Sequence, residues 1–118
     1  MDSLTSDEVA SLVAALDALE GDLHAQLEAS AAGARPVDLE EPIGRLSRME
    51  AMQQQSMTQA NRRAAQLRLK QIEAARQRIS RDEYGDCAEC DEPIGRERLA
   101  VRPEAPLCIG CQGRREKR

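Results

Sequence analysis

The sequence predicts a mainly α-helical protein, in which an antiparallel helical hairpin of coiled-coil type is followed by a small domain built on four cysteines. Among its 118 residues are no Trp or Phe and a single Tyr, so a broad core of large aromatic side chains cannot form. Two long stretches repeat apolar residues at helical spacing on either side of a break that contains glycine and proline. The four cysteines all lie in the last third of the chain, in two Cys-x2-Cys pairs.

The first helix is expected over about residues 6–30. Thr5 and Glu8 have the spacing of a capping box, in which each side chain accepts a hydrogen bond from the backbone of the other residue. Leucines then recur every three or four residues and give the helix one apolar face. That face comprises Val9, Leu12, Leu16, Leu19, Leu23 and Leu27.

A turn is predicted at residues 31–42, where one glycine and two prolines interrupt the helical pattern. The second helix then runs from about residue 43 to residue 80. We expect its apolar stripe to pack against the first helix, with Met57 in the groove between them. The stripe comprises Met49, Met52, Met57, Ala60, Ala64, Leu67, Ile72, Ala75 and Ile79. The arginines of this helix, which are Arg62, Arg63, Arg68, Arg76 and Arg78, are expected on its solvent face, so that Arg62→Ala should cost little stability.

The cysteine spacing predicts a zinc site. Zinc prefers four thiolate or imidazole ligands, and a two-residue gap lets both sulfurs of a pair reach one ion. The ligands would be Cys87, Cys90, Cys108 and Cys111. Two disulfides are the alternative, but residues 1–3 open an acidic segment without the cationic start of a signal peptide, so we expect a cytoplasmic protein with reduced cysteines. Four sulfur ligands leave no open position, which favours a structural role for the metal.

Three regions follow from these patterns: a helical hairpin at residues 1–83, a C4 zinc finger at 84–112 and a basic C-terminal tail at 113–118. Within the finger, Leu99 and Val101 alternate with Ala100 and Arg102, which predicts a short strand or hairpin arm over the metal. Prolines at 93, 103 and 106 argue against a helix there. The tail is short and lacks an aromatic residue, so we expect it to be disordered.

Charge is distributed unevenly along the chain. Residues 1–44 carry ten acidic side chains and one basic one, whereas residues 45–118 carry sixteen basic and eleven acidic ones. This asymmetry argues against a protein that coats nucleic acid, and a basic protein could bind the acidic end. An enzyme is not expected, because there is no nucleophile paired with a base, no phosphate-binding loop and no open metal position. No apolar stretch is long enough to cross a membrane, and we expect a monomer.

The finger resembles the DksA/TraR family of bacterial transcription regulators over about thirty residues, and the hairpin before it resembles the family in architecture. The resemblance is carried by Tyr84-Gly85-Asp86-Cys87-Ala88-Glu89-Cys90, Pro93-Ile94-Gly95, Arg98-Leu99, Arg102-Pro103 and Leu107-Cys108-Ile109-Gly110-Cys111. It implies a coiled-coil rod that enters the secondary channel of RNA polymerase and modulates initiation, often together with the nucleotide ppGpp. It also implies that the finger helps to hold the rod on the polymerase without reading DNA sequence.

Acidic residues at the rod's tip act near the polymerase active centre in this family, in the motif Asp-x-x-Asp-x-Ala. Matching by distance to the first cysteine places Gly44, Ser47 and Met49 at the motif positions, so neither carboxylate is present. A similar pattern lies slightly upstream at Asp38, Glu41 and Ile43, with Glu40 adding charge. We therefore expect Asp38, Glu40, Glu41, Ser47 and Met49 to contact the partner. A zinc finger that binds nucleic acid is the alternative function, although the chain offers scattered arginines and no aromatic stacking platform.

Overall fold

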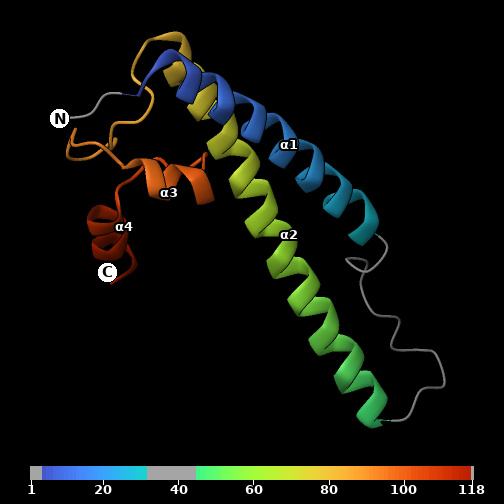
Figure 1. Ribbon diagram of the computed structural model, residues 1–118. Coiled ribbons are helices and arrows are strands. Elements are labelled where there is room, and N and C mark those ends of the chain that lie inside the picture. The colour runs from blue at the N-terminus through green and yellow to red at the C-terminus, as the bar shows by residue number, and fades with distance from the viewer. Residues whose placement is uncertain (1–3, 32–44, 118) are drawn as a thin grey trace.

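A computed structural model describes residues 4–31 and 45–117 of the chain, and the side chains from residue 48 onward in the second range. Its helices are α1 (Ser6–Ser30), α2 (Arg45–Ser80), α3 (Arg96–Val101) and α4 (Ile109–Glu116) (Figure 1). The described residues form no β-strand, and they contain one isolated antiparallel bridge, between Asp86 and Pro93. The protein is therefore mainly α-helical, as the sequence predicts.

The start of α1 is fixed by the predicted capping box. The Glu8 backbone N–H donates to Thr5 Oγ1 at 3.1 Å, and the Thr5 backbone N–H donates to Glu8 Oε1 at 2.9 Å. These two bonds satisfy backbone donors that have no partner within the helix. The helix then continues to Ser30, so the predicted range of 6–30 is confirmed.

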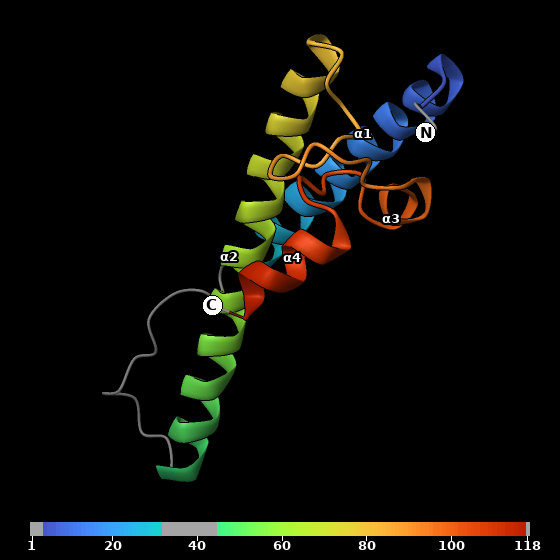
Figure 2. The same cartoon turned by 90° about the vertical axis from the view of Figure 1, so that its left-hand side faces the viewer.

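The core of the hairpin lies between α1 and α2, which run antiparallel and cross (Figures 1 and 2). Leu16 and Leu23 of α1 are buried against Ala65, Ile72 and Ala75 of α2. Around them lie the half-buried residues Leu19, Leu27, Leu69, Ile79 and Tyr84. The two helices diverge toward the start of α1 and the end of α2, and the segment after α2 approaches both helices there (Figure 2). Because Ala65 and Ala75 are small, they leave space on α2 for the large side chains of Leu16 and Leu23.

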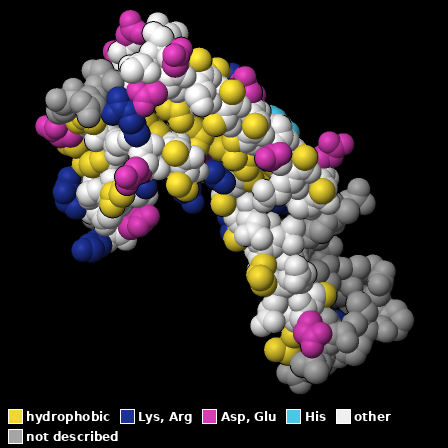
Figure 3. All heavy atoms as spheres, in the orientation of Figure 1, with side chains coloured by type: hydrophobic (Ala, Val, Ile, Leu, Met, Phe, Trp, Pro, Cys, Tyr) yellow, Lys and Arg dark blue, Asp and Glu magenta, His cyan; other side chains and the backbone are white. Residues whose placement is uncertain are grey.

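The predicted stripe is wrong for the first part of α2. Met49, Met52, Met57 and Leu67 are 54%, 48%, 60% and 56% exposed, and Ala60 and Ala64 are exposed as well. For Met49, Met52, Met57 and Ala60 the reason is the length of α1, which ends at Ser30 beside Arg62. Ala64 and Leu67 lie beside α1, but on a face of α2 outside the buried cluster. The stretch 45–61 of α2 runs on beyond that point for about 25 Å at roughly 1.5 Å per residue (Figure 1). Figure 3 shows separate apolar side chains on this part of the surface.

The predicted solvent face for the arginines of α2 is also wrong, since three of them form hydrogen bonds or ion pairs with other parts of the chain. Arg62 donates through Nη1 to the Leu27 carbonyl and to Ser30 Oγ, the latter at 2.8 Å. Arg76 Nη2 lies 2.8 Å from Asp17 Oδ1 and 3.0 Å from Glu20 Oε1. Arg68 pairs with Glu104 near the finger. Side chains on the edges of the α1–α2 seam are long enough to reach across it, whereas Arg63 faces solvent as expected.

Arg62→Ala is expected to lower the free energy of unfolding by about 1–2 kcal/mol, because it removes the cation at the end of α1. The last turn of α1 has no basic residue of its own, so Arg62 supplies the charge that its carbonyl groups attract. Urea unfolding followed by circular dichroism measures the change. Arg63→Ala is the matched control and should lie within about 0.5 kcal/mol of the parent. Equal losses in the two variants would mean that the contact contributes nothing.

Two predictions for the C-terminal region are corrected by the structure. Residues 96–101 form α3 where a strand was expected, because Leu99 is buried while Val101 is 77% exposed, and the helix fits between Pro93 and Pro103 without containing either proline. Gly95 precedes this helix with a positive φ of 105°, a conformation that favours glycine. The expected disordered tail is helical through Glu116, since α4 begins directly after Cys108.

Candidate metal centre

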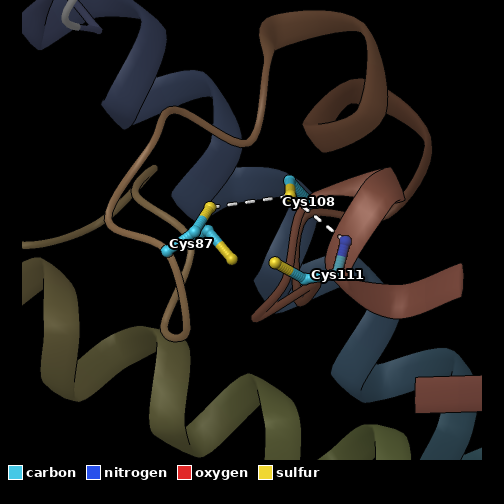
Figure 4. A group of neighbouring side chains, drawn as sticks. Cys87, Cys108 and Cys111 are labelled. Atoms are coloured by element: carbon cyan, nitrogen blue, oxygen red, sulfur yellow. Dashed lines mark hydrogen bonds between the residues drawn. The ribbon is translucent and has the colours of Figure 1, made fainter. Parts of the chain in front are cut away.

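The four cysteines come from two segments of the chain. Cys87 and Cys90 lie in the loop between α2 and α3, whereas Cys108 is the residue that caps α4 and Cys111 lies in its first turn. All four sulfur atoms lie within 4.8 Å of one another, and all four cysteines are free thiols. In Figure 4 the side chains of Cys87, Cys108 and Cys111 converge on one point between the loop and α4. The disulfide alternative therefore does not describe this structure.

The geometry of the sulfur atoms fits zinc. Tetrahedral bonds of about 2.3 Å from a zinc ion place its thiolate ligands roughly 3.8 Å apart. The sulfurs of Cys90 and Cys108, one from each pair, are separated by 3.8 Å. Four sulfurs complete a tetrahedron and leave no position for water or substrate, so the site suits a structural ion.

The first cysteine pair sits in a tight backbone turn. The Cys87 backbone N–H donates to the Glu92 carbonyl at 2.8 Å, and the Asp91 N–H donates to the Cys87 carbonyl at 3.0 Å. Asp91 adopts a positive φ of 62°, a conformation that Asp tolerates better than most residues. These bonds turn the chain so that both sulfurs of the pair face the same side.

Gly85, just before this turn, has a backbone conformation that favours glycine. Its φ is +101°, and a Cβ atom there would lie 2.9 Å from Leu4 Cδ1. Leu4 lies just before Thr5, the N-cap of α1, so this contact joins the start of the N-terminal helix to the finger. The backbone conformation is the main reason for glycine here, because the end of the Leu4 side chain can shift to accommodate a Cβ atom.

The protein environment affects the thiols unequally. Burial opposes ionisation of Cys87, but hydrogen bonds from the backbone of Cys108, Cys90 and Glu89 outweigh it and lower its pKa to about 6. Burial raises the pKa of Cys111 to about 12, and the neighbouring thiols add to this effect. Metal binding requires thiolates, so the lowered pKa of Cys87 favours binding of a cation, whereas ionisation of Cys111 depends on the charge of the ion itself.

The finger packs on the hairpin through a second apolar cluster. Cys87, Ile94, Leu99, Leu107 and Cys111 are buried there, and they contact the half-buried Leu4, Leu12, Tyr84 and Cys108.

At the surface Arg96 Nη2 donates to Glu8 Oε1 at 3.0 Å. The hydrogen bond from Arg96, followed by that from the Thr5 backbone, lowers the pKa of Glu8 to about 2. The Glu8 carboxylate thus caps α1 and also binds the first residue of α3.

An ion pair between α2 and the finger, involving a buried glutamate, is not predicted from the sequence. Glu104 is fully buried, and its Oε2 accepts a hydrogen bond from Arg68 Nε at 2.7 Å. Beside it the Tyr84 hydroxyl donates to the Pro103 carbonyl at 2.8 Å, and burial raises the pKa of Tyr84 to about 12. Arg-Pro-Glu in a loop is typical of an exposed turn, so no local pattern distinguishes this glutamate from a solvated one.

Of the residues expected at the tip, Asp38, Glu40 and Glu41 lie outside the described residues, as do residues 32–42 of the predicted turn. Ser47 belongs to the first turn of α2, and Met49, two residues further along, is exposed. Their role stays a prediction. Within residues 4–31 and 45–117, no helix has the length and apolar character needed to cross a membrane.

Removing zinc by chelation, or replacing Cys87 by Ser, is expected to loosen residues 84–112 while most of the helix content of α1 and α2 remains. The finger has a small core whose members include two of the cysteines, whereas the hairpin has its own buried cluster. Amide hydrogen exchange should rise in the finger, and circular dichroism should retain most of its helical signal. Complete loss of that signal would mean that the hairpin depends on the metal.

The fold and the metal centre define a class of protein, namely a helical hairpin attached to a C4 zinc finger. Residues 82–117 match the family model described as the prokaryotic dksA/traR C4-type zinc finger. A solved structure, that of transcription factor DksA2 from Pseudomonas aeruginosa, aligns with 95% of this chain and 85% of that one, with a TM-score of 0.70 and 30% identity. The chain belongs to the DksA/TraR family, and its cofactor is one structural zinc ion.

Curated relatives match over shorter segments. The RNA polymerase-binding transcription factor DksA of Haemophilus influenzae is 40% identical over 57 residues, which cover 48% of this chain and 39% of that protein. The protein of the same name from Escherichia coli K12 is 32% identical over 72 residues, which cover 61% of this chain and 46% of that protein. The matched segments thus cover less than half of the length of these relatives.

Proposed function

We propose that this protein binds RNA polymerase and modulates transcription initiation, with the helical rod entering the secondary channel. The observation that carries the proposal is the likeness to transcription factor DksA2, which extends over both the hairpin and the finger. The names of the curated relatives support the same partner. In this proposal the chain is cytoplasmic and monomeric, and it acts through binding rather than catalysis.

The proposal divides the chain into parts with different tasks. Residues 1–83 form the rod with its tip at 31–42, residues 84–112 form the finger, and residues 113–118 extend it. Zinc bound by Cys87, Cys90, Cys108 and Cys111 would keep the finger folded against α1 and α2. The finger together with the adjoining ends of α1 and α2 forms the base, which would supply affinity for the polymerase. The contacts of Glu8 with Arg96 and of Arg68 with Glu104 fix the finger on the two helices and so set the direction of the rod.

Retention by purified core RNA polymerase tests the proposal directly. The zinc-loaded protein should co-elute with the polymerase in size-exclusion chromatography and should compete with a protein known to occupy the secondary channel. The alternative, a finger that binds nucleic acid, predicts salt-dependent binding to bare duplex DNA instead. Adding ppGpp to the initiation assay tests the nucleotide as a co-effector at the polymerase interface. Binding to DNA without retention by polymerase would reject the proposal in favour of the alternative.

The triple variant Asp38→Asn, Glu40→Gln, Glu41→Gln is expected to bind polymerase within a few-fold of the parent but to lose its effect on initiation in vitro. Neutralising the carboxylates removes the local electric field that the tip would bring near the catalytic centre, while it leaves the base unchanged. Open-complex lifetime on a responsive promoter measures the effect. If the triple variant regulates as well as the parent, Ser47 and Met49 become the next residues to test.

A further inference from the structure

Two successive arginines of α4 contact the two halves of the cysteine site. Arg114 Nη2 donates to the Cys111 sulfur at 3.0 Å. Arg115 pairs with Glu89, which lies between the two cysteines of the first pair. Figure 3 shows basic side chains gathered on the face that α4 contributes. Two arginines of the basic C-terminal segment therefore lie against the metal centre.

The contact between Arg114 and Cys111 has the chemistry that a zinc–thiolate cluster needs. A zinc ion with four thiolates carries roughly two negative charges in total, and charge that is shielded from water requires a partner. The four cysteines differ in exposure, since Cys90 is exposed whereas Cys87 and Cys111 are each only 1% exposed. The guanidinium of Arg114, an exposed residue, therefore contacts the sulfur of one of the two most buried cysteines.

The local geometry makes this contact part of the fold. Arg114 follows Cys111 by three residues, so both side chains lie on the same face of α4 one turn apart. Cys108, at the start of the helix, accepts a hydrogen bond from the Cys111 backbone N–H at 3.4 Å. The first turn of α4 thus orients both sulfurs of the second pair, and Arg114 adds a positive charge from the next turn.

We propose that Arg114 is a positioning residue of the zinc centre, which holds the Cys111 side chain toward the other sulfurs and offsets part of the charge of the cluster. Its consequence is slower loss of zinc. Residues that orient metal ligands in this way typically change metal affinity by about 10- to 100-fold. The proposal concerns retention of the ion and does not depend on the polymerase as partner.

The test is the rate at which the zinc-loaded full-length protein transfers its ion to an excess of a chromogenic chelator. Arg114→Ala should release zinc about tenfold faster than the parent. Arg114→Lys keeps the charge and should stay within about threefold of the parent, because a lysine can still approach the cluster. Lys117→Ala is the matched control, since it removes one positive charge from the residue that follows α4 and should leave the rate unchanged.

A spectroscopic readout separates this role from simple support of the helix. In the cobalt-loaded protein, the absorption band from thiolate-to-metal charge transfer depends on hydrogen bonds to sulfur. Arg114→Ala should shift that band to longer wavelength, and Lys117→Ala should not. The proposal is overturned if Arg114→Ala releases zinc at the rate of Lys117→Ala with an unchanged cobalt band. It is also overturned if the alanine and lysine variants of Arg114 lose zinc equally fast, which would mean that packing alone is involved.

Discussion

Leu16→Asp is expected to unfold the helical hairpin under conditions in which the parent is stable. Leu16 is completely buried between α1 and α2, where it packs in the cluster with Leu23, Ile72 and Ala75. The substitution removes the apolar contacts of a leucine, worth about 2–5 kcal/mol, and adds a carboxylate without a partner in a seam of alanine and leucine. A total loss of roughly 5 kcal/mol is comparable with the whole stability of many small domains.

The matched control is Leu67→Asp, which makes the same chemical change on the partner helix. The apolar periodicity of the sequence assigns Leu67 to the seam, whereas in the structure it is 56% exposed. We expect its cost to stay below about 1 kcal/mol. Thermal unfolding by circular dichroism of both zinc-loaded variants measures the difference. Comparable melting temperatures would mean that the faces of α1 and α2 are assigned wrongly.

Arg68→Met is expected to lower the free energy of unfolding by about 3–5 kcal/mol, because it leaves the Glu104 carboxylate buried without its cation. The side chain of Glu104 is 0% exposed, while that of Arg68 is 30% exposed, so the penalty falls on the carboxylate. Glu104 Oε1 has no hydrogen-bond partner within the described structure, and Arg102 Nη1 remains at 3.7 Å from Oε2. Arg68 is therefore the main partner that Glu104 has.

A double-mutant cycle makes this prediction specific. Glu104→Leu replaces the buried carboxylate by an apolar side chain, and the combination with Arg68→Met removes both charges. Because an apolar pair can replace a buried ion pair at little cost, the double variant should be more stable than Arg68→Met alone. Urea unfolding of the zinc-loaded proteins gives the coupling energy. A double variant as unstable as the sum of the two single variants would show that the two side chains act independently.

The sequence predicts the elements whose signals are local. The capping box of Thr5 and Glu8 begins α1 as expected, and the glycine and prolines after Ser30 end the helical pattern. The spacing of the cysteines likewise determines the metal centre, since short-range turns orient each pair and the fold only has to bring the pairs together. The four sulfur atoms consequently lie together in the structure as predicted.

The faces of α2 could not be predicted with the same success, because they depend on where a second helix ends. The periodic pattern identifies an apolar stripe but not its partner, and α1 is too short to cover Met49, Met52 and Met57. For the same reason the pattern predicts Arg62 and Arg68 on the solvent face, although each contacts an element that is distant in sequence. Contacts across about 30 residues leave no local signal.

Alternation over four residues also proved too short to distinguish a strand from a helix. Leu99 and Val101 fit the period of a strand, but the buried surface that receives Leu99 lies on one side only. A six-residue helix satisfies that requirement with one buried leucine, and Pro103 beyond its end limits its length. Glu104 shows the complementary difficulty, because its burial is decided by Arg68 on another helix rather than by its own neighbours.

The unequal lengths of α1 and α2 give the rod two segments with different mechanical stiffness. Where both helices pack side by side, bending would have to displace the buried leucines and alanines against one another, so this segment of the rod is rigid. Within the described residues, 45–61 of α2 contribute nothing to this buried seam, and a helix outside such a seam bends more readily because packing supplies most helical stability. The rod is thus rigid next to the zinc-bound base and more flexible at its far end. Such a rod can adapt its far end to a narrow space while the base keeps its position.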